Sequence, residues 1–121
     1  MKPTDSIPLL SSASRPTILI VDDDEAIQDL VNIYTQEQGF QTRSCPSAET
    51  ALEDMRKFFC PIVITDVQMP GMGGLSLCGK LRAGKWPGYV YIIVMPGHDQ
   101  EDGVVEALDA GADDYLHKGA P

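Results

Sequence analysis

Residues 17–24 read TILIVDDD, an apolar run of β-forming residues that ends in three aspartates. Residues 61–66 read PIVITD and repeat this arrangement with a single aspartate at the end. Short apolar runs without polar alternation are typical of strands buried on both faces of a parallel sheet. Parallel strands joined by right-handed crossovers all end at one edge of the sheet. We therefore expect Asp22, Asp23 and Asp66 to meet at that edge, where open α/β sheets bind their ligands.

The rest of the chain alternates strand patterns with helix patterns. The strand patterns lie at residues 17–21, 41–45, 62–65, 89–95 and 114–117. The first helix is expected to start after its N-cap Asp24 and to stop at Gly39. Its apolar face has i, i+3, i+4, i+7 spacing and consists of Ile27, Leu30, Val31 and Tyr34. This alternation predicts an α/β fold, a doubly wound five-stranded parallel sheet with helices on both faces.

Three further helix patterns separate the later strands. The residues expected to face inward are Ala48, Ala51, Leu52 and Met55 after Pro46-Ser47; Leu75, Cys78 and Leu81 after the MPGMGG loop of residues 69–74; and Val104, Ala107 and Leu108 in a helix over about 101–110. Gly111 is the expected stop of that last helix.

Length and composition indicate one domain. The chain has 121 residues, 43% of them hydrophobic, and a net charge of −9. Residues 1–16 contain three prolines and four serines without any period, so we expect a leader or linker there and the domain over 17–121. The acidic charge argues against direct binding of nucleic acid or an anionic membrane. No apolar run approaches the ~20 residues of a membrane helix, and the patch at 7–10 is too short for a secretory signal.

Three cysteines, Cys45, Cys60 and Cys78, are present without a CxxC pair. An odd number at these spacings favours neither a disulfide framework nor structural zinc. We expect reduced thiols, in the core or on the surface, and a cytoplasmic location.

The expected edge residues suit magnesium and phosphoryl chemistry. Mg²⁺ prefers oxygen ligands and is commonly held by one or two carboxylates together with phosphate. Asp23 and Asp66 fit that role, with Asp22 reaching the ion through water. Asp66 is the best candidate nucleophile, because a carboxylate can attack a phosphoryl donor and form an aspartyl phosphate. Lys118, which follows the last strand pattern, would supply a fixed positive charge beside it.

Taken together, ILIVDDDE, IVITDVQMPGMGG and ALDAGADDYLHK resemble the response-regulator receiver domain of two-component signalling, over residues 17–118. The resemblance implies the flavodoxin-like receiver fold. It also implies roles for individual residues. Asp22 and Asp23 would be the acid pair, Asp66 the phosphoacceptor and Lys118 the active-site lysine. Gln68 would offer its backbone carbonyl to Mg²⁺, and Tyr115 would be the aromatic side chain that changes rotamer on activation.

The same resemblance implies partners. A histidine kinase or phosphotransfer protein would donate the phosphoryl group, and an output domain would lie outside this chain. The chain would not be an enzyme, beyond catalysing its own phosphorylation and dephosphorylation.

Two positions depart from the receiver pattern. Receivers normally end the fourth strand with Thr or Ser, whose hydroxyl binds a phosphoryl oxygen, whereas Pro96 stands there in this chain. Proline has neither a side-chain donor nor a backbone N–H. Gly97 can offer its backbone N–H, and we expect His98 to be a bystander. The switch, rather than phosphorylation itself, is therefore in question.

The second departure is at the chain end, where Lys118 is followed only by Gly-Ala-Pro. Receivers usually continue with a proline and a fifth helix that packs on the sheet. A sheet that lacks this last helix would leave apolar surface available for association. Either the chain is a fragment of a longer regulator, or a partner or a second copy covers that surface. We favour a fragment that self-associates as a homodimer.

Two other functions remain open. The domain could be a degenerate receiver that acts only as a protein-interaction module. It could also be a Mg²⁺-dependent phosphohydrolase with an aspartate nucleophile, since Asp22-x-Asp24 after a strand matches the start of that superfamily. In that case Asp22 would be attacked and Asp24 would act as acid and base. The small size, the missing cap domain and Asp66 in its MPG context weigh against it.

Overall fold

The computed structural model describes residues 16–95 and 103–116. Five strands alternate with four helices in this part of the chain. The strands are β1 Thr17–Val21, β2 Gln41–Cys45, β3 Ile62–Asp66, β4 Tyr91–Met95 and β5 Asp114–Tyr115. The helices are α1 Glu25–Glu37, α2 Ala48–Lys57, α3 Gly74–Ala83 and α4 Gly103–Ala110.

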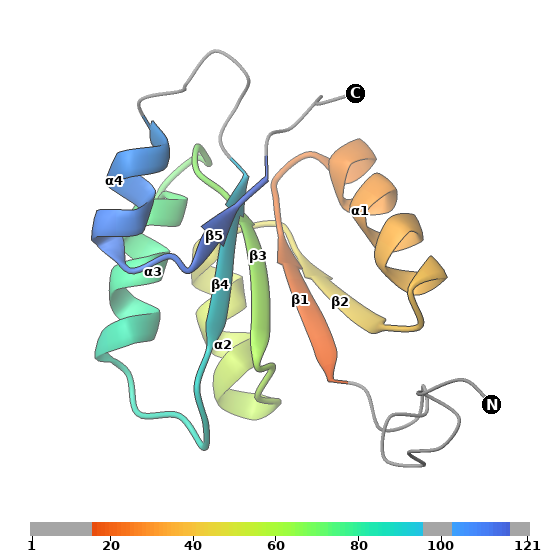
Figure 1. Ribbon diagram of the computed structural model, residues 1–121, viewed down its shortest axis with the longest axis horizontal. Helices are drawn as coiled ribbons and strands as arrows, with labels where there is room; N and C mark the ends of the chain where they lie inside the picture. The colour runs from red at the N-terminus through yellow and green to blue at the C-terminus, as the bar shows by residue number, and fades with distance from the viewer. Residues whose placement is uncertain (1–15, 96–102, 117–121) are drawn as a thin grey trace, which may run out of the picture.

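All strand pairs are parallel, and the strand order in the sheet is β2-β1-β3-β4-β5. The chain thus winds outward from β1 in one direction to β2 and in the other to β3, β4 and β5. Figure 1 shows α1 on one face of the sheet and α2, α3 and α4 on the other. The predicted doubly wound α/β fold is confirmed, and no fifth helix occurs among the described residues.

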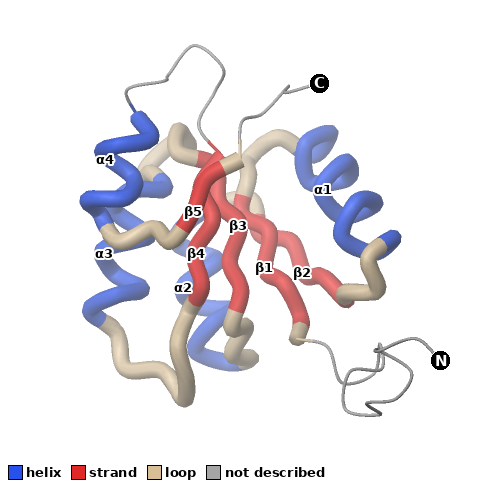
Figure 2. Tube along the Cα trace, in the orientation of Figure 1, coloured by secondary structure: helices blue, strands red, loops and turns tan. Residues whose placement is uncertain are grey.

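The sheet, whose strands lie between the helices in Figure 2, separates two hydrophobic clusters. The larger one lies under α2, α3 and α4 and includes Leu19, Val63 and Val94 from the strands. The smaller one lies under α1, where Ile20 and Ile64 are buried. Adjacent residues of a strand point to opposite faces, so strands that are apolar throughout supply both clusters. This explains why the TILIV and PIVIT runs lack polar alternation.

The predicted inward face of α1 needs correction. Leu30 is 63% exposed and Tyr34 is 65% exposed, whereas Thr35 is buried. The helix meets the sheet along a narrower stripe of Ile27, Val31 and Thr35, spaced by four residues, and the Thr35 hydroxyl donates to the Val31 carbonyl at 2.9 Å. A helix that packs without a helical neighbour on its face contacts the sheet along one line, so the flanks of its apolar stripe stay in solvent.

Other boundaries and orientations also differ from expectation. The fourth strand starts at Tyr91 rather than at residue 89, and the third extends one residue further, to Asp66. Leu108 of α4 was expected inside but is 44% exposed, while Ala107 is fully buried. The small Ala107 lets this short helix pack closely, which leaves Leu108 on its outer side. Val104, the third residue expected to face inward from this helix, lies outside the residues whose side chains the structure describes.

No helix within residues 16–95 and 103–116 combines the length and apolar character that crossing a bilayer requires.

The three cysteines are all buried and free. Burial is also the largest cause that raises the pKa of the Cys78 thiol to about 11. This thiol is therefore protonated near neutral pH and serves as a core residue.

Candidate functional site

The first part of the site is the turn that leaves β1. Asp22 is fully buried, and its backbone N–H donates to the Cys45 carbonyl at 3.1 Å, which extends the ladder with β2. Its Oδ1 accepts the N–H of Asp24 at 2.9 Å. Asp24 in turn caps α1, because its Oδ1 accepts the N–H of Ala26 at 2.9 Å. The turn thus fixes the direction of Asp22, while Asp23 between the two remains exposed.

Gln28 of α1 also holds this turn. Its side-chain amide donates to the backbone carbonyl of Asp22 at 2.5 Å and to that of Cys45 at 3.5 Å. One helical side chain therefore joins the ends of β1 and β2 at the point where the acidic residues emerge.

The second part of the site is the end of β3. Asp66 is its last residue, is 5% exposed and pairs in register with Met95 of β4. The backbone carbonyl of Asp66 accepts the buried Thr65 hydroxyl at 3.0 Å. Because β3 lies next to β1, with Val21 opposite Thr65, the side chain of Asp66 emerges beside those of Asp22 and Asp23.

The loop after β3 folds tightly under Asp66. Gly74 donates its N–H to the Val67 carbonyl at 2.9 Å, and a Cβ at Gly74 would lie only 2.0 Å from the Asp66 carbonyl oxygen. Gly71 has a φ of +78°, a backbone conformation that favours glycine. The carboxylate of Glu49, from the first turn of α2, accepts the N–H of Met72 at 3.2 Å. These contacts set where α3 begins relative to Asp66.

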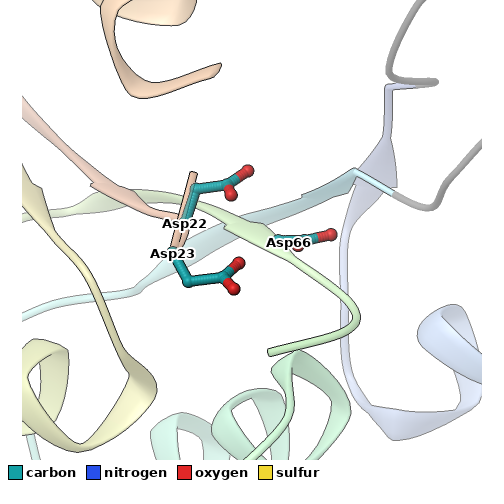
Figure 3. Close-up of side chains that lie close together, drawn as sticks. All are labelled: Asp22, Asp23 and Asp66. Atoms are coloured by element: carbon teal, nitrogen blue, oxygen red, sulfur yellow. The ribbon is translucent and has the colours of Figure 1, made fainter. Parts of the chain in front are cut away.

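Figure 3 shows the three carboxylates of Asp22, Asp23 and Asp66 extending toward one region from the ends of β1 and β3. One oxygen from each lies within 4.8 Å of the other two. Oxygens on opposite sides of a bound Mg²⁺ are about 4 Å apart, so this spacing suits a hard cation with only small adjustments. Three converging carboxylates also repel one another in the absence of a cation. The donor set and its spacing therefore fit Mg²⁺.

The other predicted site residues divide into two groups. Gln68 lies in the β3–α3 loop, two residues after the end of β3, and is exposed, and Tyr115 of β5 is 39% exposed. Lys118, Pro96 and Gly97 fall outside the described residues, as does His98. Their predicted roles stay predictions.

Sequence reasoning missed two residues that shape the site. Gln28 is not among the residues of α1 that the sequence pattern singles out, and no local signal reveals that its side chain reaches two strand ends. Gly74 had a weak signal, since two adjacent glycines before a helix indicate a close backbone approach.

Comparison with known proteins identifies the family of this chain. The model of the response regulator receiver domain family matches residues 18–121. The chain belongs to this family. The curated relatives of this receiver domain include regulatory protein VanR of Enterococcus faecium, which is 37% identical over 102 residues, 84% of this chain and 42% of VanR. The DNA-binding response regulator MtrA of Mycolicibacterium paratuberculosis is 34% identical over 104 residues, 86% of this chain and 45% of MtrA. The receiver domain thus spans less than half the length of these two relatives.

Solved structures share the fold of this receiver domain. The receiver domain of the Francisella response regulator 1452 superposes with a TM-score of 0.78 at 27% identity, covering 88% of this chain and 87% of that one. The protein is therefore a receiver domain of a two-component response regulator, as its sequence motifs predict.

Proposed function

We propose that this receiver domain accepts a phosphoryl group on Asp66 from a histidine kinase or a phosphotransfer protein. The observation that carries the proposal is the convergence of three carboxylates within 4.8 Å at the ends of β1 and β3. Asp66 is the only one of the three on β3, where it is 5% exposed and the loop beneath it is fixed by Gly74.

In the proposed step a carboxylate oxygen of Asp66 attacks the phosphorus of a phosphohistidine. A new oxygen–phosphorus bond forms as the nitrogen–phosphorus bond breaks, and the imidazole leaves as it gains a proton. Mg²⁺ would neutralise negative charge on the transferred group. Asp23 and Asp66 would hold it directly, Asp22 through water, and Gln68 through its backbone carbonyl. Lys118 would pair with Asp66 and then with the phosphoryl oxygens.

This chemistry does not make the domain an enzyme acting on a separate substrate. We propose that it is limited to its own phosphorylation and dephosphorylation, in the cytoplasm. MtrA is described as a DNA-binding response regulator, and a domain outside this chain would supply such an output. The net charge of −9 disfavours DNA binding by this chain, which supports the proposal that a separate output domain would bind DNA.

The test is mass spectrometry of the intact chain after treatment with acetyl phosphate and Mg²⁺. We expect a gain of one phosphoryl group in the native chain and none in Asp66→Asn. Asp109→Asn is the matched control, because Asp109 is an exposed aspartate on α4, and it should gain the group as the native chain does. A native chain that never gains mass would instead support the degenerate receiver, an interaction module without phosphoryl transfer.

Borohydride trapping separates phosphorylation of Asp66 from the phosphohydrolase alternative. Label on Asp66 supports the receiver chemistry, and label on Asp22 supports the hydrolase. The capping bond between Asp24 and Ala26 weighs against the hydrolase, because it occupies the carboxylate that would have to act as acid and base.

We further propose that phosphorylation is only weakly coupled to the surface around Tyr115, because Pro96 replaces the expected hydroxyl. Losing one hydrogen bond to a charged group forfeits about 1.5–3 kcal/mol, which is comparable with the few kcal/mol that drive a typical population shift. NMR spectra with and without beryllofluoride and Mg²⁺ should show large shifts near Asp66 and small ones at Tyr115. Shifts at Tyr115 as large as those near Asp66 would contradict weak coupling.

A further inference from the structure

A hollow of about 310 Å³ lies where α2 and α3 end and the chain turns toward β4. Its apolar lining comes from Leu52, Ala83 and Trp86, and its charged lining comes from Arg56, Lys80 and Lys85. Because α2 and α3 run antiparallel to the strands, this hollow lies at the end of the molecule opposite the acidic site (Figure 1).

Trp86 forms a fixed wall of the hollow. Its indole N–H donates to the Leu81 carbonyl at 2.7 Å, and its ring stacks near Phe59 with the ring centroids 6.4 Å apart. A Cβ at Gly84 would lie 2.8 Å from the indole nitrogen, so the glycine is what lets the ring sit this close. The polar atom of the indole is therefore already satisfied, and what the ring offers a ligand is apolar surface.

The three cations of the hollow have no acidic partner in the described ranges. Salt bridges there join Arg43 to Asp54 and Arg82 to Asp113, and neither pair lines the hollow. Lysines and arginines in a last helical turn often only complement the helix dipole. The helix dipole explains the positions of Arg56 and Lys80, which lie in the last turns of α2 and α3. It does not explain Lys85, which lies beyond the end of α3. Three cations without a salt bridge among the described residues thus gather around an apolar wall in a chain whose net charge is −9.

We propose that this hollow binds an acidic peptide segment of a partner protein, with one apolar side chain of the segment against Leu52 and Trp86. The cations would pair with flanking carboxylates, and the indole would supply apolar contact area. A small phosphate ligand fits less well, because both helices direct carbonyls rather than N–H groups toward this end. Nucleic acid and anionic membranes fit less well, because they extend beyond the hollow and would also face the acidic remainder of the chain, whereas a short peptide segment contacts the hollow alone.

Binding here goes beyond the phosphoryl chemistry and does not depend on it. The acidic site and the hollow lie at opposite ends of the sheet, so a partner could occupy one while the other is engaged. The mass measurement on Asp66 and the binding measurement below can therefore fail independently.

The hollow contains the single tryptophan of the chain, which makes fluorescence a direct probe of it. The probe is a short peptide of glutamates around one central leucine, titrated into the intact chain at low salt, with calorimetry as a second measurement. We expect a saturable change in Trp86 emission with heat of binding. We expect neither when glutamines replace the glutamates, nor with inorganic tripolyphosphate.

Variants then locate the binding. The double variant Lys80→Gln/Lys85→Gln should weaken binding by roughly three- to tenfold, as expected for partly exposed ion pairs. The matched control is Lys57→Gln, because Lys57 is an exposed cation in the last turn of α2 that does not line the hollow. It should bind within about twofold of the native chain.

Several results would overturn the proposal. The proposal fails if the peptide causes neither a change in Trp86 emission nor heat of binding. It also fails if the glutamine peptide binds as well as the glutamate peptide, or if Lys57→Gln weakens binding as much as the double variant does. Binding of vesicles rich in phosphatidylserine without binding of the peptide would show instead that the surface takes a membrane.

Discussion

At the scale of single residues, two glycines of α3 have opposite surroundings. Gly74 begins the helix directly against the Asp66 backbone, where a Cβ would lie 2.0 Å from the carbonyl oxygen. Gly79 lies in the middle of the same helix, and a Cβ there would meet nothing within 4 Å. The first glycine is required by a close backbone approach, whereas the second only makes the unfolded chain more flexible.

Replacing each glycine by alanine should therefore have opposite effects. Gly74→Ala should lower the free energy of unfolding by about 1–3 kcal/mol or more, because either the loop or Asp66 must move. Gly79→Ala should raise it by about 1 kcal/mol, the difference in helix propensity. Urea denaturation measures both changes. Equal stability of the two variants would show that the loop after β3 can yield without cost.

At the scale of elements, one ionic cluster joins α3, β4 and the turn after α4. Arg82 of α3 donates to the Val90 carbonyl at 2.6 Å, to the Gly111 carbonyl at 2.8 Å and to the carboxylate of Asp113 at 2.6 Å. The same carboxylate accepts the N–H of Ile92 at 2.8 Å and a hydrogen bond from the Tyr89 hydroxyl. This cluster ties β5 and α4 to the body of the domain at the end away from Asp66.

The cluster makes stability depend on pH. Partial burial raises the pKa of Asp113, but hydrogen bonds from Tyr89 and Ile92 and the charge of Arg82 outweigh burial, so the pKa lies below its ordinary 3.8. The Asp113 carboxylate therefore binds a proton less readily in the folded chain than in the unfolded chain. The stabilisation is present above the unfolded pKa and is lost as pH falls through the lower, folded pKa.

Asp113→Asn should remove this dependence. At neutral pH the variant should be less stable by about 1–3 kcal/mol, because it loses charge-assisted hydrogen bonds. Below the ordinary carboxyl pKa its stability should approach that of the native chain. Urea denaturation at a series of pH values measures the difference, and Asp109→Asn on the exposed side of α4 is the control. A constant difference down to strongly acidic pH would contradict the assigned role of Asp113.

At the scale of the whole molecule, the two faces of the sheet are covered unequally. Three helices pack on one face, whereas in the described ranges α1 is the only helix on the other. On the α1 side, Ile33 of the helix is 56% exposed and Leu116, next to the end of β5, is 51% exposed. Tyr91 of β4 is 41% exposed and lies two residues before Ile93, on the same face of the strand, and Ile93 contacts the α1-side cluster. This apolar surface is suited to association.

We therefore predict that this chain self-associates through its α1 side. Sedimentation should show a monomer–dimer equilibrium that shifts toward the dimer as concentration rises. Ile33→Asp should weaken it, because burying a charge in the contact is costly, whereas Val105→Asp, a change at an exposed apolar residue of α4 on the opposite face, should not. A folded monomer at the highest attainable concentration would refute the prediction.

Much of the architecture follows from local pattern. The apolar runs ending in aspartate indicated a parallel sheet and placed Asp22, Asp23 and Asp66 at one edge, because crossover handedness leaves little choice of topology. Helix caps were equally readable, since Asp24 and Ser47 both accept hydrogen bonds in the first turn of their helices.

Sequence by itself therefore determined the order of strands and helices, the edge where the acidic residues meet and the family to which the chain belongs. All three depend on short-range periodicity and on motifs. Tertiary structure alone decided that Leu30 and Leu108 face solvent, that Gln28 joins two strand ends and that Trp86 lines a hollow with Lys85. Each of these depends on which element packs against which, and packing brings together residues that are distant in the chain. Local periodicity contains no information about those distances.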